Sequence, residues 1–143
     1  MHGKADLPFR AITIMPVENK TLEPKLQDRL NRILTDTFME YGFDVRPAAA
    51  YTLSGSVTDF TLQVLSERDL TASEYAIIIK ADFEFRDGDG KAAKLVGVGS
   101  PFVTYFSATG KLENVIAEKE VATDRALQDL SEELLRRVLY QAP

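Results

Sequence analysis

The chain has 143 residues, of which 45% are hydrophobic and 27% are charged, so its composition is that of one folded domain and not of a disordered chain. Its formal net charge of −5 gives no support to a duplex-binding protein, which usually carries a basic patch. The chain has no cysteine and one histidine, His2, which excludes a disulfide scaffold, a multi-histidine metal site and a Ser-His-Asp triad within one chain.

Two features of the sequence bear on the compartment. No apolar run approaches the roughly 20 residues that a membrane-spanning helix needs. The first eight residues lack the apolar core of a signal peptide. Composition leaves two alternatives open, a cytosolic protein and a trimmed mature form of an exported one.

The first half of the chain predicts a strand, a helix and a short strand. Residues 10–17 supply an apolar strand, and residues 43–47 form a short one that a proline ends. Pro24 suits the first turn of a helix, and Gly42 is typical of the position just after a helix. Between them, apolar residues recur on one helical face: Leu26, Leu30, Ile33, Leu34, Thr37, Phe38 and Tyr41.

Two long strands follow, over residues 51–65 and 75–85. In the first, apolar residues occupy odd positions up to Val57 and even positions from Phe60 onward. One extra residue reverses the facing of everything after it, so the change near Thr58 predicts a β-bulge. We interpret the polar residues 66–73 between the two strands as a loop.

The last third predicts a returning strand and a second helix. Residues 87–90 (DGDG) are a strong hairpin turn signal, and the strand over 95–105 is broken at 99–101. A loop at 108–114 leads to a helix that ends at about Gln141. The predicted apolar stripe of this helix is Val121, Leu127, Leu130, Leu134 and Val138. The pairs Glu132–Arg136 and Glu133–Arg137 have i,i+4 spacing and predict a solvated face.

The predicted element order is therefore β-α-β-β-β-β-α. Two helices against one sheet give an α+β, two-layer sandwich: a mostly antiparallel sheet of four to five strands with both helices on one face. We expect a single domain over residues 1–143, with residues 1–6 as a disordered tail.

The lengths of these elements predict an incompletely covered sheet. The long strands would reach roughly 35–50 Å at about 3.3 Å per residue, whereas the helix over 24–41 is only about 27 Å long at 1.5 Å per residue. The apolar residues at risk of exposure are Phe60, Leu62, Val64, Leu65 and Leu70. An uncovered apolar end suggests a partner or a lipid. Two alternatives remain: the strands bend at the bulge, or the longer second helix covers the rest.

Catalysis has little support in the sequence. Asp59, Asp82 and Glu84 could hold a carboxylate pair for acid–base chemistry, but they fall on polar strand faces, where solvated charges are the usual case. We therefore expect no enzyme activity, no cofactor and no metal.

Several short segments together resemble the LptE family, the lipopolysaccharide-assembly lipoproteins of the Gram-negative outer membrane. The matching segments are LP at 7–8, ITIMPVENKT at 12–21, LEP at 22–24, LSGSV at 53–57, ASEY at 72–75, FRDG at 85–88, and Glu118, Ala126 and Leu130 in the closing helix. The family's lipidated N-terminal cysteine is absent, so this chain would have to begin just after it. A tryptophan frequent in the penultimate strand is also missing, with KLV at 94–96 in that region.

The resemblance implies a non-enzymatic periplasmic domain, lipid-anchored at the outer membrane. It would plug the lumen of the LptD β-barrel, help assemble that barrel and help pass lipopolysaccharide to the cell surface. The resemblance also implies lipopolysaccharide-binding residues at Arg68 and Lys111. A guanidinium can grip a lipid A phosphate with two hydrogen bonds, and a lysine acts as a point charge. For these two residues the alternative is a pair of solvated loop cations. For the function, the alternative is another periplasmic lipoprotein or adaptor of the same fold that binds a protein partner.

The topology brings these two cations to one end of the sheet. In an antiparallel meander the loop at 66–73 and the exit of the returning strand lie at the same end, opposite the turn at 87–90. We therefore expect Arg68 and Lys111 to lie near each other, beside Leu65, Leu70 and Leu112.

Overall fold

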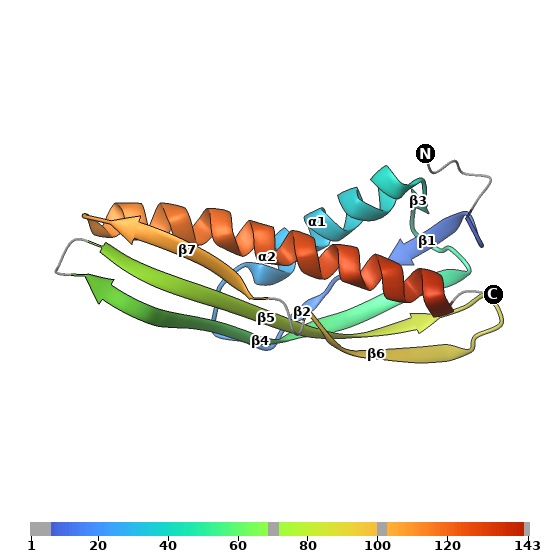
Figure 1. Ribbon diagram of the computed structural model, residues 1–143. Helices are drawn as coiled ribbons and strands as arrows, with labels where there is room; N and C mark the ends of the chain where they lie inside the picture. Colours follow the sequence, from blue (N-terminus) through green and yellow to red (C-terminus); the bar gives the residue numbers. More distant parts are fainter. Residues whose placement is uncertain (1–6, 69–71, 100–102, 142–143) are drawn as a thin grey trace.

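The computed structural model of the protein describes residues 7–68, 72–99 and 103–141 (Figure 1). Two helices, α1 (Leu26–Tyr41) and α2 (Leu112–Gln141), lie on one face of a mostly antiparallel sheet, which confirms the predicted α+β sandwich. The strands of the described residues are β1 (Ala11–Ile14), β2 (Glu18–Asn19), β3 (Asp44–Val45), β4 (Tyr51–Arg68), β5 (Ala72–Arg86), β6 (Ala92–Val98) and β7 (Thr104–Thr109). The tail predicted at 1–6 lies outside the described residues.

The antiparallel pair β4–β5 is the centre of the sheet. Its register runs from Thr52 opposite Arg86 to Arg68 opposite Ala72. The register shifts between Val57 and Asp59, which confirms the predicted bulge. The pairing also continues to Arg68, so the loop predicted at 66–73 is shorter than expected. Polar side chains suit the exposed end of a strand as well as a loop, and hydropathy cannot separate the two.

The sheet is wide at one end and narrow at the other. On one side of β4, β1 and β2 pair in parallel with residues 51–53 and 56–57. On the far side of β5, β6 pairs with residues 81–86 and β7 with residues 72–77. The single returning strand of the prediction is therefore two strands, and one half of the sheet contains β4, β5 and β7 alone. We call this half, with residues 59–68, 72–77, 104–109 and 112–121, the narrow end.

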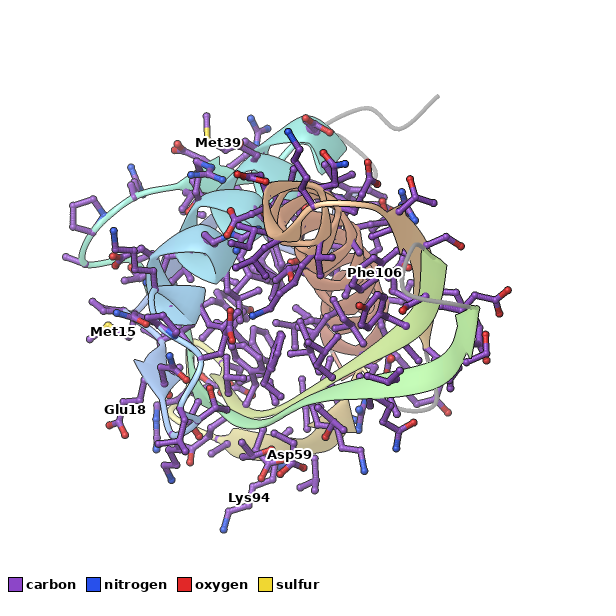
Figure 2. The ribbon with its side chains drawn as sticks, turned by 90° about the vertical axis from the view of Figure 1, so that its left-hand side faces the viewer. Met15, Glu18, Met39, Asp59, Lys94 and Phe106 are labelled. Carbon is purple, nitrogen blue, oxygen red and sulfur yellow. The ribbon has the colours of Figure 1, made fainter. Side chains whose placement is uncertain are left out.

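The core lies between the helices and the sheet. Figure 2 looks along the molecule from the narrow end and shows side chains filling this space, with Asp59 and Lys94 on the outer side of the sheet. The largest fully buried side chains include Leu30, Leu34, Phe38, Leu53, Leu127, Leu130 and Leu134. The predicted stripe of α1 is thus confirmed. The stripe of α2 is wrong at Val121, which is 55% exposed. Neither helix is long and apolar enough, over its described residues, to cross a membrane.

The predicted surface pair Glu133–Arg137 makes tertiary contacts with β6 and the residue after it. The N–H of Gly99 donates a hydrogen bond to the Glu133 carboxylate (3.1 Å), and Arg137 donates to the carbonyl oxygen of Val96 (3.0 Å). Glu133 and Arg137 also pair with each other at 3.4 Å. They therefore hold the end of β6 against α2, a role that helical spacing could not reveal because the partners are backbone groups of a distant strand.

The buried hydroxyl of Ser131 gives a first testable prediction. Ser131 is fully buried in α2, and its Oγ has no hydrogen-bond partner among the described residues. A buried polar group without a partner carries a desolvation penalty, so Ser131→Ala should raise the free energy of unfolding by about 1 kcal/mol. Urea denaturation of both proteins measures this difference. A loss of stability of the same size would show that the hydroxyl has a partner in solution.

Candidate binding site

The core-facing side of α2 continues past the core at the narrow end. Leu112 and Ile116 follow the same helical spacing as the buried residues Thr123, Leu127 and Leu130. They are nevertheless 71% and 52% exposed. The cause is the length of α1, which begins at Leu26 and does not extend beside the first turns of α2 (Figure 1).

The strand opposite these helix turns is uncovered as well. Leu62 and Val64 of β4 pair with Ile77 and Tyr75 of β5, so they point toward the helix side of the sheet. They are 39% and 55% exposed, as the element lengths predicted. Leu65 is also exposed, whereas Leu70 lies outside the described residues. The two-layer sandwich thus has an open apolar end between α2 and β4.

The outer face of the narrow end is apolar too. Tyr105 of β7 and Leu65 of β4 are both exposed and line a shallow hollow of about 140 Å³. On the helix side of the sheet, Tyr75 and Phe106 stack with ring centroids 4.8 Å apart. Apolar side chains therefore reach solvent on both faces of the narrow end, a pattern typical of an interaction surface.

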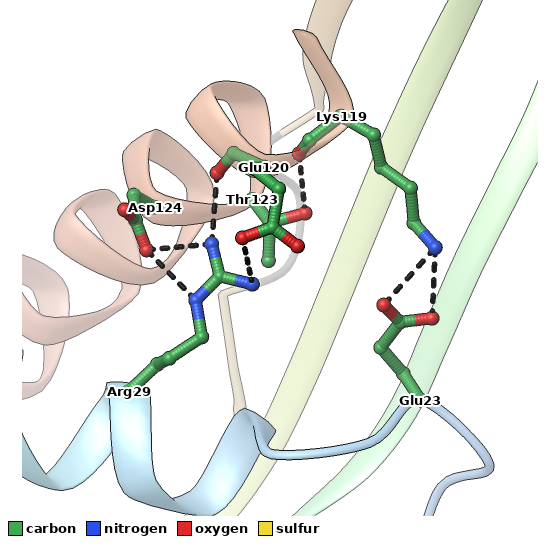
Figure 3. A network of polar contacts seen from close by, with 6 residues as sticks. All are labelled: Glu23, Arg29, Lys119, Glu120, Thr123 and Asp124. Atoms are coloured by element: carbon green, nitrogen blue, oxygen red, sulfur yellow. Dashed lines mark hydrogen bonds and ion pairs between the residues drawn. The ribbon is translucent and has the colours of Figure 1, made fainter. Parts of the chain in front are cut away.

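A polar network closes the core just inside the open end (Figure 3). Arg29 of α1 binds the Asp124 carboxylate of α2 at 2.7 and 3.0 Å and donates to the carbonyl oxygen of Glu120 at 2.8 Å. Glu23 pairs with Lys119 at 3.0 Å, and the Lys119 ammonium lies 5.5 Å from the ring centroid of Phe60. Phe60 is therefore covered by α2, as one of the two alternatives predicted. Leu62 and Val64, farther along β4, are not covered by this helix and stay exposed.

No local pattern in the sequence indicates this network, because its partners are far apart in the chain. Arg29 and Asp124 are separated by 95 residues. An isolated pair of this kind on a solvated helix contributes at most about 1 kcal/mol. Here three ion pairs and the backbone contact act together, because Arg29 also lies 3.6 Å from the Glu120 carboxylate. They hold α2 to α1 and to the segment before α1 at the boundary of the open end.

The backbone brings the two predicted cations to the narrow end. Arg68 pairs with Ala72, and Ala72 pairs with Thr109 on the next strand, so the three residues form one row across the sheet. Lys111 follows Thr109 by two residues and is exposed, and its carbonyl oxygen accepts the N–H of Asn114 at 3.0 Å as α2 begins. The side chain of Arg68 is not among those the structure describes.

The described residues contain no candidate metal site by residue type. Within residues 7–68, 72–99 and 103–141, no group of His, Cys, Asp or Glu side chains could hold a metal ion. The fold and the open end define a class of protein: a small two-layer α+β domain with exposed apolar side chains at one end, a pattern typical of an interaction surface.

Comparison with known families identifies that class further. The sequence model of the LptE family, described as lipopolysaccharide-assembly, matches residues 9–138, and the chain therefore belongs to this family. It is a family of non-enzymatic lipoproteins for lipopolysaccharide assembly at the outer membrane. No sequence among the curated proteins matches the chain.

Solved structures of bacterial proteins, among them two lipoproteins, share the fold. A minor lipoprotein from Acinetobacter baumannii aligns with a TM-score of 0.57 and 15% identity, covering 94% of this chain and 93% of that one. The rare lipoprotein B from Shewanella oneidensis aligns with a TM-score of 0.51 and 10% identity, covering 90% and 92%. The protein XCC0632 from Xanthomonas campestris aligns with a TM-score of 0.56 and 14% identity, covering 92% and 84%. At these identities the likeness concerns the fold alone.

Proposed function

We propose that this protein is a non-enzymatic, lipid-anchored periplasmic domain that plugs an LptD-like outer-membrane β-barrel, helps to assemble it and binds lipopolysaccharide. The observation that carries the proposal is the open apolar end of the sandwich, with Lys111 and the end of β4 beside it. Membership of the LptE family supports it.

The chemistry of the open end suits an anionic amphiphile. Lipid A carries both phosphates and acyl chains, and a site for it needs cations beside apolar surface. Lys111 and Arg68 supply two cationic residues at the end of the sheet. The exposed apolar residues of α2 and β4 supply the surface for acyl chains: Leu62, Val64, Leu112 and Ile116.

The shape of the domain supports the plug. The molecule is elongated, and β1, where the described chain starts its first strand, lies toward the end opposite the narrow end (Figure 1). A lipid attached upstream of β1 would hold the wide end at the membrane. The narrow end would then reach into the barrel lumen, where its exposed apolar side chains are removed from water.

A charge-reversal experiment tests the lipopolysaccharide site. The double variant Arg68→Asp/Lys111→Asp should bind lipopolysaccharide about tenfold or more weakly, because two attractive charges become repulsive. Binding of the wild type should also weaken with added salt, which screens exposed charges. Surface-immobilised lipopolysaccharide titrated at two salt concentrations measures both effects.

The matched control changes charge by the same amount at the wide end. Lys91→Asp/Lys94→Asp replaces two exposed lysines far from the site. This control and the test variant should both keep the wild-type melting temperature and co-purify with the barrel. Full lipopolysaccharide binding by the test variant at low salt would remove Arg68 and Lys111 from the site. Co-purification with a soluble protein in place of a barrel would favour an adaptor.

A further inference from the structure

One side of β4 is paired along its first half and vacant along its second. β1 and β2 pair with this side in parallel, with Met15 N–H donating to the Leu53 carbonyl (2.8 Å) and Lys20 N–H to the Val57 carbonyl (2.9 Å). From residue 59 onward, β5 is the one strand that pairs with β4 in the described part of the chain. Two short segments thus already use the same edge, and beyond them no other strand of the described residues pairs with it (Figure 1).

The vacant stretch begins at a hollow. After Asn19 the chain leaves the sheet for α1, and between residues 20–23 and 58–61 it leaves a space of about 370 Å³. Leu22 projects fully into solvent at its rim. The hollow lies on the line that β2 would follow if it continued along β4, so an added strand has a place to start.

The register identifies which backbone groups face the vacant side. The Val57 carbonyl points to that side, and Val57 lies opposite Ala81 of β5. Ala81 has an odd number, and so do the residues of β5 that lie opposite Phe60, Leu62 and Val64, namely residues 79, 77 and 75. Because backbone groups alternate in direction along a strand, the N–H and C=O groups of these three residues also point away from β5. They form a row of unpaired donors and acceptors.

This row lacks most of the features that protect natural sheet edges. Residues 60–64 (FTLQV) contain no charged residue and no proline. The register shift between Val64 and Ser66 is the one disruption in this part of β4, and it limits the flat stretch to residues 59–64. We call the vacant side of these six residues the edge slot. An unprotected edge of this kind is a template for a further strand.

We propose that an extended segment of the barrel partner adds to the edge slot as a strand; this rests on the proposed function. The occupant is a peptide and not a lipid, because acyl chains cannot pair with backbone N–H and C=O groups. The wall strands of a closed barrel are all paired, so the segment comes from a loop or terminus that enters the lumen.

The surroundings of the slot set the chemistry of that segment. Its alternate side chains on the helix side are apolar, since they join Leu62, Val64 and Ile116 at the open end. Its other side chains are polar, since they lie beside Asp59, Thr61 and Gln63 of β4 on the outer side of the sheet. One of these is basic, because it lies beside the exposed carboxylate of Asp59.

The experiment uses the full chain co-expressed with its barrel partner. A photo-crosslinking amino acid replaces Gln63, on the exposed strand beside the slot, or Lys94, an exposed control site on β6. The amino acid at position 63 should crosslink to a single segment of the barrel protein. The amino acid at position 94 should not crosslink to that segment. Val64→Pro removes one N–H from the slot and should lower the crosslink yield about tenfold. Val64→Ala keeps the N–H and loses part of an apolar contact, so it should lower the yield by much less than Val64→Pro.

Hydrogen exchange provides a second measurement that needs no variant. In the wild-type complex the amides of Phe60, Leu62 and Val64 should exchange more slowly than in the free protein. If Val64→Pro does not fold, this measurement alone tests whether a strand adds to the edge slot. Co-purification without crosslinking or slowed exchange would overturn the strand addition and leave the plug intact. Failure to co-purify would contradict the plug and the strand with it. A crosslinked dimer of this chain alone would show that a second copy fills the slot.

Discussion

Replacing Gly99 with alanine will destabilise the protein by about 3 to 5 kcal/mol. Two independent effects add at this position. The backbone φ of Gly99 is +99°, a conformation that costs an L residue about 1–3 kcal/mol. A Cβ atom there would also collide with the backbone carbonyl oxygen of Ile79, which cannot move without breaking the sheet, and would crowd the Leu130 side chain at 3.0 Å.

The same substitution at Gly90 separates these two effects. Gly90 has a φ of +84° in the turn before β6, but no atom lies within 4 Å of its missing Cβ. Gly90→Ala should therefore cost about 1 kcal/mol, the conformational part alone. Urea denaturation of the three proteins measures the difference. Equal losses for the two variants would mean that the end of β6 adjusts freely, and that the Gly99 contact with Glu133 does not fix it.

The features that the sequence predicted well are those with a local periodicity. The bulge at Thr58 is visible because a register shift of one residue exchanges buried and exposed faces along the rest of β4. The buried stripe of α1 is visible because a helix beside a core needs one continuous apolar face. The exposure of Leu62 and Val64 followed from comparing element lengths, which needs no knowledge of packing.

The features that escaped prediction depend on partners distant in sequence. β2 has two residues, too few for any periodicity, and is a strand because it lies against β4. The returning segment is divided because β6 and β7 pair with different halves of β5. In α2, the predicted stripe included Val121, which faces solvent. Continuing the spacing of Thr123 toward the N-terminus would have selected Ile116, and with it a part of the candidate site that the sequence analysis did not name.

The second large effect concerns the open end, where we expect substitutions to weaken lipopolysaccharide binding with little change in the free energy of unfolding. The double variant Leu112→Asp/Ile116→Asp should weaken lipopolysaccharide binding by about a hundredfold or more, since each of the two buried leucine-sized side chains contributes about 1.5–3 kcal/mol to an apolar contact. It should change the free energy of unfolding by less than about 0.5 kcal/mol, because both side chains are already exposed in the folded protein.

Tyr140 supplies the matched control. It is also an exposed large apolar residue of α2, 88% accessible, but it lies at the opposite end of the helix. Tyr140→Asp should leave both lipopolysaccharide binding and the melting temperature unchanged. Leu127→Asp, in the core, should unfold the protein, since a buried unpaired charge is far costlier than an exposed one. If Leu112→Asp/Ile116→Asp unfolds the domain in the same way, the first turns of α2 belong to the core in solution. If it folds and binds lipopolysaccharide like the wild type, the open end is not the acyl-chain site, and its apolar side chains serve the barrel contact alone.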